Sequence, residues 1–173
     1  MSIRASTTAS DPAYRAGALA LFGALSTILM AHGFERFGGY PPCPLCLMQR
    51  YAYYAAIPVL FLALVLLAMG RYRAAALTFF AVALAFLANA GLGTYHAGAE
   101  WKFWPGPDTC SAVLTPAAPS AGGLLKQLET TRVARCDEAP WHLLGLSFAG
   151  WNVVISFLLF VAALQAAFAA ARR

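Results

Sequence analysis

The sequence predicts an all-α integral membrane protein, a bundle of four transmembrane helices with two extracytoplasmic loops. The first reason is composition, because 61% of the 173 residues are apolar and only 11% are charged, whereas about a quarter of the residues in a soluble domain are charged. The second reason is a set of four long apolar runs, which are Ala16–Phe34, Tyr51–Met69, Ala74–Tyr95 and a run within Leu143–Ala171. Each run is long enough to cross a bilayer. In lipid a helix forms all its backbone hydrogen bonds internally, whereas an open strand cannot, so the runs are predicted to be helices.

One membrane domain accounts for nearly the whole chain. Residues 1–13 are expected to form an N-terminal cytoplasmic tail, and residues 14–173 a single four-helix domain. The expected spans are about 16–34, 47–69, 74–95 and 147–170, joined on the outer side by loops 35–46 and 96–146. The first run is longer than the apolar core of a cleaved signal peptide and a second run follows it closely, so we interpret it as a span.

Basic residues orient these spans. Three short segments, before the first span, between the second and third, and after the fourth, carry Arg4, Arg15, Arg71, Arg73, Arg172 and Arg173. These are half of the 12 Lys and Arg residues, and six of the seven acidic residues, all but Asp11, fall in the other two connections. The positive-inside rule therefore predicts that both termini are cytoplasmic and that the two outer loops lie on the extracytoplasmic side. The net charge of +5 is explained by membrane anchoring and calls for no nucleic-acid partner.

All four cysteines lie in the two outer connections. Cys43 and Cys46 precede the second apolar run, and Cys110 and Cys136 lie between the third and fourth. The first and third connections of a four-span chain are on the same side, so both pairs lie at one membrane surface. Disulfides persist outside the cytoplasm, and sequence alone allows three connectivities. The arrangement suits a protein that passes electrons from thiols into the membrane.

The segment around Cys43 and Cys46 is predicted to enter the second helix through prolines, which are tolerated in a first helical turn. Cys46 should then lie near a helix N-terminus, which favours a thiolate. Arg50 follows by four residues on the same helix face. It could hold the Cys46 thiolate, a lipid phosphate or the oxygen of a bound quinone, or simply extend to the head groups. Gln49 adds hydrogen-bonding groups nearby.

Cys-x-x-Cys pairs also occur in zinc, thioredoxin-type and c-type haem sites, and each of these sites requires further residues or elements around the pair. Structural zinc needs four ligands and the sequence has no second close pair, so no metal site is predicted. A thioredoxin motif would need a βαβ pattern, and Leu47 stands where a c-type haem site needs histidine. The interpretation of the pair as a purely structural disulfide in the loop also stays open.

The second outer connection is rich in proline and glycine. Cys110 and Cys136 are separated by 25 residues, and a disulfide in such a tether is expected to be labile. Within it, Gly123–Arg135 has the pattern of a short amphipathic helix on the membrane surface, or of a solvated loop helix. His96 ends the third span at the depth of Cys46 and Arg50, so a role beside a polar ligand is plausible.

These residues resemble one family, the disulfide bond formation protein B (DsbB) family. The match consists of Cys43-Pro44-Leu45-Cys46-Leu47-Met48-Gln49-Arg50, Thr94-Tyr95-His96, the stretch Glu100–Pro107, the distant pair Cys110 and Cys136, and Leu144-Gly145-Leu146. It covers the chain from the first span to the last. The resemblance implies a bacterial inner-membrane enzyme that reoxidises a periplasmic thioredoxin-fold dithiol oxidase (DsbA type) and reduces a quinone, either ubiquinone or menaquinone.

By position, the resemblance also implies roles for single residues. Cys110 would form the mixed disulfide with the soluble partner, and Cys136 would pair with Cys110 and exchange with Cys43. Cys46 would contact the quinone. Arg50 would bind or polarise that quinone, with His96 and Gln49 as supporting candidates.

Two alternatives stay open at this point. One is an enzyme similar to the vitamin K epoxide reductase family, which also uses Cys-x-x-Cys in a helical bundle. The other is a non-catalytic membrane protein whose disulfides are structural.

Overall fold

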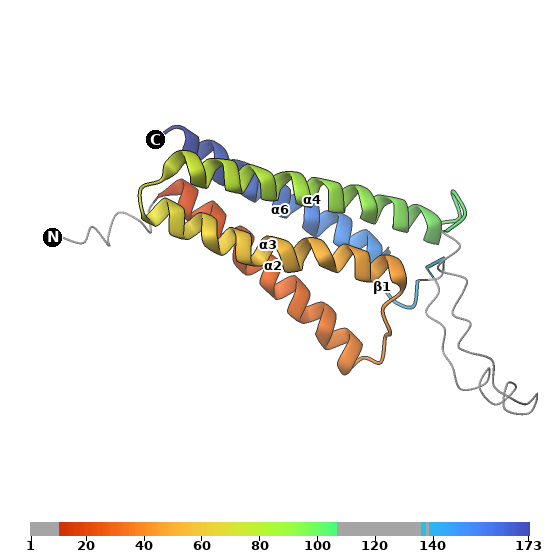
Figure 1. The fold of residues 1–173 in the computed structure, drawn as a ribbon. Helices are drawn as coiled ribbons and strands as arrows, with labels where there is room; N and C mark the ends of the chain where they lie inside the picture. The colour runs from red at the N-terminus through yellow and green to blue at the C-terminus, as the bar shows by residue number, and fades with distance from the viewer. Residues whose placement is uncertain (1–10, 107–135, 138) are drawn as a thin grey trace, which may run out of the picture.

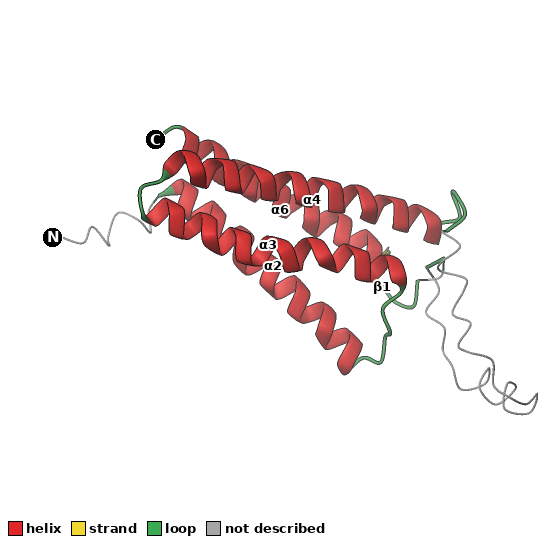
Figure 2. Cartoon of the chain, in the orientation of Figure 1, coloured by secondary structure: helices red, strands yellow, loops and turns green. Residues whose placement is uncertain are grey.

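Four long helices lie side by side in the computed structural model, which describes residues 11–106, 136–137 and 139–173 (Figure 1). They are α2 (Pro12–Arg36), α3 (Pro44–Ala68), α4 (Tyr72–Glu100) and α6 (Phe148–Ala171). All four are long and apolar enough to cross a membrane. The predicted all-α four-helix membrane bundle is therefore confirmed, and most of the described chain is helical in Figure 2.

Each helix packs against two neighbours around the bundle. Helix α2 contacts α3 and α6, and α4 contacts the same two helices from the other side. Small residues allow this close packing: Ala20 and Ala24 of α2 are fully buried. At Gly17 a Cβ atom would stand 2.7 Å from the ring of Phe79, so only glycine fits there without displacing that ring.

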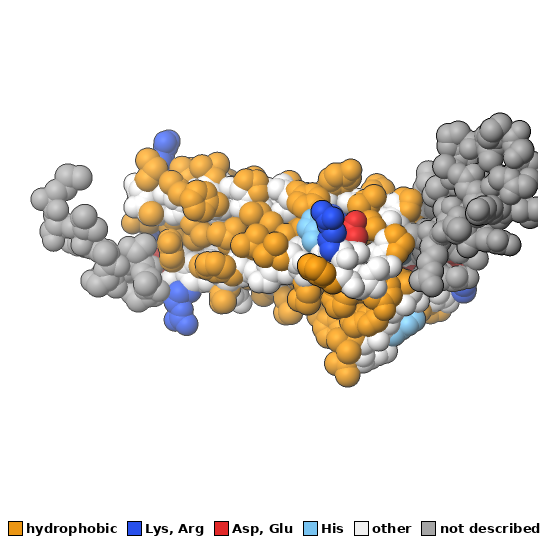
Figure 3. Space-filling model, turned by 90° about the horizontal axis from the view of Figure 1, so that it is seen from below, with side chains coloured by type: hydrophobic (Ala, Val, Ile, Leu, Met, Phe, Trp, Pro, Cys, Tyr) orange, Lys and Arg blue, Asp and Glu red, His pale blue; other side chains and the backbone are white. Residues whose placement is uncertain are grey.

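Large apolar side chains cover the outside of the bundle. Phe22, Phe61, Leu77 and Phe157, one from each helix, are all more than half exposed. The face in Figure 3 is mostly apolar, with one small group of charged and histidine side chains within it. Such an exposed apolar surface is expected where lipid replaces water as the solvent.

The two ends of the bundle differ. The start of α2, the end of α6 and the tight turn between α3 and α4 lie at one end, while the start of α3, the end of α4 and the start of α6 lie at the other (Figure 1). Toward this second end α2 leans away from the other helices. This is the end that carries Cys43 and Cys46.

Two features of that end differ from expectation. Helix α4 continues to Glu100 rather than ending near Tyr95. A small hairpin of β1 (His142–Leu143) and β2 (Leu146–Ser147) leads into α6. Its turn residues Leu144 and Gly145 have φ angles of 53° and 81°, which is the backbone of a type I′ turn. The helix expected over Gly123–Arg135 lies outside the described residues.

Candidate functional site

The thiol pair lies at the first turn of α3. Cys43 is the N-cap residue, and its Sγ accepts a hydrogen bond from the Cys46 backbone N–H at 3.2 Å. The two sulfur atoms are 2.7 Å apart and are not bridged. Cys46 lies at the third position of the helix, but Cys43 takes the helix N-terminal N–H that we expected to favour a Cys46 thiolate. The cap residue precedes the first turn, so its side chain can fold back onto the free N–H groups.

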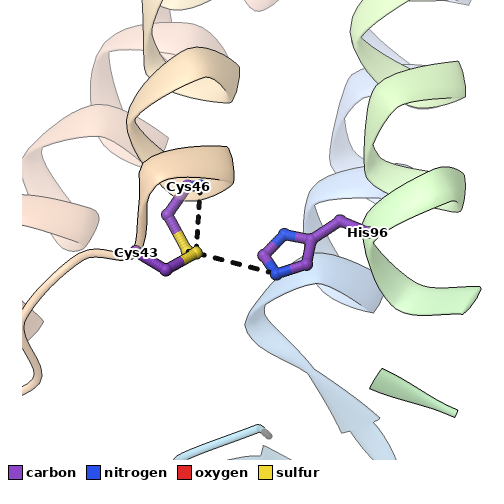
Figure 4. A group of neighbouring side chains, drawn as sticks. All are labelled: Cys43, Cys46 and His96. Atoms are coloured by element: carbon purple, nitrogen blue, oxygen red, sulfur yellow. Dashed lines mark hydrogen bonds between the residues drawn. The ribbon is translucent and has the colours of Figure 1, made fainter. Parts of the chain in front are cut away.

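His96 of α4 faces this pair. Its Nε2 lies 3.7 Å from Cys43 Sγ, and its Nδ1 is 3.0 Å from the Gln49 side-chain nitrogen. Figure 4 shows the imidazole pointing from α4 toward the two sulfurs on α3. The hydrogen bond from the Cys46 thiol, helped by His96 and opposed by burial, lowers the pKa of Cys43 from 9.0 to about 5. Cys43 is thus the sulfur that the surroundings favour as a thiolate when both are reduced.

Glu100 joins the same group, although the sequence argument gave it no role. It lies one turn after His96, with Oε1 3.8 Å from His96 Nε2, and its side chain is 5% exposed. Ser147, the N-cap of α6, donates a hydrogen bond to the other carboxylate oxygen. The spacing of four residues could have revealed the pair, but the helix was expected to end before it.

Arg50 has a partner that sequence reasoning did not foresee. Its Nη1 donates to Glu35 Oε2 at 2.5 Å, across the gap between α3 and α2. His32 lies 3.7 Å from the same oxygen and accepts or donates a hydrogen bond with Tyr54 at 2.8 Å. Glu35 was assigned to a loop, but α2 extends through Arg36, and this brings its carboxylate to Arg50.

Cys136 lies next to the first cysteine pair. It is fully buried and packs in one cluster with Cys43 and Leu45, and it is disulfide-bonded. Lys102, just after α4, donates to the Asp137 carbonyl oxygen at 2.8 Å and pairs with the Asp137 carboxylate at 2.9 Å. These contacts fasten the segment that carries Cys136 to the end of α4. Cys110 lies outside the described residues.

A cavity of about 770 Å³ opens beside the thiols. Cys43 and Cys46 lie on its wall together with the polar side chains Gln49, Arg50, Tyr53, His96, Glu100 and Asn152. Most of the remaining lining is apolar and comes from α2, α6 and the outer connections. The volume and the small number of converging polar groups are typical of a site for an organic ligand.

Aromatic rings form one wall of this cavity. Trp141 stacks on Phe148 with ring centroids 4.7 Å apart, and Phe34 contacts both rings at 5.2 to 5.3 Å. Tyr40 adds an edge contact to Phe148 at 5.8 Å. Four rings from two stretches of the chain, 34–40 and 141–148, therefore border a space that would suit a flat, apolar ligand.

Comparisons with known proteins agree on one family. The family model described as "Disulfide bond formation protein DsbB" matches residues 14–166. A "Disulfide bond formation protein B" of Aromatoleum aromaticum (strain DSM 19018 / LMG 30748 / EbN1) is 32% identical over 133 residues, which are 73% of this chain and 75% of that protein. An uncharacterized protein, RP370, of Rickettsia prowazekii (strain Madrid E) is 25% identical over 139 residues, 80% of this chain and 76% of that protein. No solved structure matches the chain.

Proposed function

This chain belongs to the disulfide bond formation protein DsbB family, and from that premise we propose that it reoxidises a soluble thioredoxin-fold dithiol oxidase and reduces a membrane quinone. Family membership makes it a multi-pass membrane protein of disulfide-bond formation, and hence an oxidoreductase. The observation that carries the finer proposal is the cavity that joins Cys46 to Arg50 between membrane-spanning helices. It puts a thiol pair against a ligand space that is open to apolar molecules.

The cavity suits a quinone in shape and in chemistry. The four aromatic rings can stack on a flat head group, and Arg50, Gln49 and His96 can donate hydrogen bonds to its oxygens. A quinone, when bound, accepts two electrons and two protons. The Arg50 guanidinium would place positive charge where negative charge develops, which is the most effective kind of help a protein gives to such a step.

The cysteines form the path to that cavity. A thiolate of the soluble partner would attack Cys110 in the Cys110–Cys136 disulfide and release Cys136 as a thiol. The second thiol of the partner would then release Cys110, so that the partner dithiol becomes a disulfide while Cys110 and Cys136 become thiols. Exchange with the Cys43–Cys46 disulfide would then return the outer pair to a disulfide and leave Cys43 and Cys46 reduced. The position of Cys136 in one buried cluster with Cys43 and Leu45 supports this exchange, because the attacking and attacked sulfurs must come into contact.

The two inner cysteines would have different tasks. Cys43 would take part in the exchange with Cys136. While Cys43 is engaged in that mixed disulfide, Cys46 is the unbridged sulfur, and it lies on the cavity wall at the helix N-terminus. Cys46 is therefore the sulfur that would hand electrons to the ligand, with Arg50 one turn further along the same helix.

Family membership and the distribution of basic residues support a proposed location. The cysteine-bearing end of the bundle would face the periplasm of a bacterial inner membrane, and both termini would be cytoplasmic, as the basic residues near them favour. Such an orientation leaves the outer pair in a compartment where disulfides persist. The lipid phase supplies the quinone, so the cavity needs no path through water.

The test is quinone reduction by the purified protein in detergent. Quinone absorbance would be followed while a reduced DsbA-type oxidase supplies electrons, with ubiquinone and menaquinone assayed separately. We expect turnover with at least one of them and none in the Cys46→Ser variant. A folded protein that reduces neither quinone with this donor would contradict the proposal.

A further inference from the structure

Three metal-ligating atoms converge at the thiol pair. Cys43 Sγ, Cys46 Sγ and a ring nitrogen of His96 all lie within 4.8 Å of one another, and the side chains point toward a common centre (Figure 4). Two thiolates and one imidazole form a ligand set that suits Zn²⁺ and other soft divalent cations. The sequence argued against zinc because it has no second close cysteine pair, but folding supplies a histidine from 50 residues further along the chain.

The groups behind these ligands are also arranged as in metal sites. The His96 Nδ1 is in contact with the Gln49 side chain at 3.0 Å. In the structure the amide nitrogen of Gln49 faces Nδ1. A half turn of the amide about its last bond would present its oxygen to an Nδ1–H and leave the Nε2 lone pair free for a metal. Such a partner on the second ring nitrogen is the usual companion of a ligating histidine, because it fixes the tautomer and the ring orientation.

Charge and burial favour a cation at this place. Cys43 is 4% exposed and His96 2% exposed, so both ligands are already desolvated and held in position. Glu100 brings a carboxylate to within 3.8 Å of His96 Nε2, and Ser147 holds that carboxylate from behind. The cavity beside the pair would give room for a fourth ligand such as water, as in zinc sites that have three protein ligands.

We propose that the reduced Cys43–Cys46 pair and His96 form a binding site for a single soft divalent cation such as Zn²⁺. Binding displaces to solvent whatever thiol protons the pair still carries and leaves the oxidation state of the sulfurs unchanged. The cation and the Cys43–Cys46 disulfide exclude each other, because both need the same sulfur electron pairs. Zinc would therefore hold the pair reduced and block electron transfer. The binding step itself does not depend on the proposed quinone reaction.

Cobalt(II) is the probe, because its thiolate complexes absorb strongly. The full chain with Cys110→Ser and Cys136→Ser, which confines the thiols to the inner pair, would be reduced, freed of reductant without oxygen, and titrated with cobalt. We expect one cation per chain, a thiolate-to-cobalt absorption band and its loss when zinc is added. The same protein with its inner pair oxidised should show no band.

Two histidine variants decide whether the site is built as described. His96→Ala removes a ligand and should weaken cobalt binding by about tenfold or more. His32→Ala removes the other histidine near α3 and should leave binding unchanged, since it contacts Glu35 and Tyr54 rather than the sulfurs. Cys46→Ser should abolish the band.

Two results would overturn the proposal: no cobalt band in reduced protein whose circular dichroism shows it folded, or equal affinity in the His96→Ala and His32→Ala proteins. Quinone turnover of the unsubstituted chain, assayed in chelator, separates this outcome from failure of the proposed function. Turnover without a cobalt band contradicts the metal site alone, and a cobalt band without turnover contradicts the quinone reaction alone.

Discussion

The guanidinium of Arg50 is bonded to the carboxylate of Glu35, with 2.5 Å between Nη1 and Oε2. This pair connects α3 to the outer end of α2, where α2 leans away from the bundle. The Arg50 side chain is 12% exposed, and Arg50 also lies on the cavity wall. Glu35 thus orients Arg50 at the edge of the cavity without occupying all five of its N–H donors.

Arg50→Ala should raise the quinone concentration needed for half-maximal turnover by about tenfold. A hydrogen bond to a charged donor contributes about 1.5–3 kcal/mol, and about 1.4 kcal/mol corresponds to a factor of ten. Steady-state quinone reduction at varied quinone concentration would measure it. Arg36→Ala is the matched control, because Arg36 is exposed and does not line the cavity. An equal rise in both variants would mean that general charge, rather than contact by Arg50, controls quinone affinity.

The Cys43 thiolate should persist into acid. With its pKa lowered from 9.0 to about 5, one thiolate is present at neutral pH in the reduced protein and disappears as the pH falls through about 5. Because the folded-state pKa is depressed, the stability that this thiolate adds is complete above the unfolded-state pKa of 9.0 and is lost progressively as the pH falls from there to about 5. Ultraviolet absorbance of the thiolate would follow the titration in the Cys110→Ser, Cys136→Ser protein.

Two variants make that titration specific. His96→Ala should shift the midpoint upward, since the imidazole contributes to the lowered pKa of Cys43. Cys43→Ser should remove the acidic transition altogether. A reduced pair that titrates only near the ordinary cysteine value of 9.0 would contradict this account of the helix-cap sulfur.

Lys102 should speed the exchange between the two cysteine pairs. It fastens Asp137, the neighbour of Cys136, to the end of α4, so Lys102→Ala should slow electron transfer from the soluble partner about two- to fivefold. The effect is small because Lys102 is exposed and such pairs contribute about 0.2–1 kcal/mol. Lys102→Arg should restore the rate.

Turnover of a protein that lacks the outer cysteine pair distinguishes an effect of Lys102 on the position of Cys136 from an effect on the fold. In the Cys110→Ser, Cys136→Ser protein supplied with a small dithiol, Lys102→Ala should have no effect, because the fastened segment no longer takes part. Slowing in that background would mean that Lys102 acts on the inner pair or on the fold.

The sequence predicted what local composition controls. Four long uncharged runs indicated the four helices, and the prolines before Cys46 indicated where α3 begins. It missed Glu35 and Glu100 as site residues because apolar runs end at the first charge, whereas the helices continue to the point where their backbone is capped. The contact of Arg50 with Glu35 joins α3 to α2, and the convergence of His96 on Cys43 joins α4 to the start of α3. Such contacts depend on how helices are placed around the bundle, which no single run specifies.

A polar network inside the bundle offers a further test. Tyr53 of α3 donates a hydrogen bond to Asn152 Oδ1 of α6 at 2.8 Å and lies 3.1 Å from Ser156 Oγ. Asn89 of α4 donates to Ser156 Oγ at 2.9 Å. The network therefore ties three helices together, and a lost bond leaves a largely buried polar atom without that partner.

Tyr53→Phe should lower the free energy of unfolding by about 1 kcal/mol, since it removes the shortest bond to Asn152 while keeping the ring that packs on Phe86. Tyr51→Phe is the matched control, because it also removes a tyrosine hydroxyl but from a side chain that is 67% exposed. This control should change the free energy of unfolding little. Thermal unfolding of both variants in the same detergent measures the difference. Equal melting temperatures would mean that the Tyr53 hydroxyl adds nothing to the packing of α3 against α6, and that the aromatic contact with α4 alone accounts for its burial.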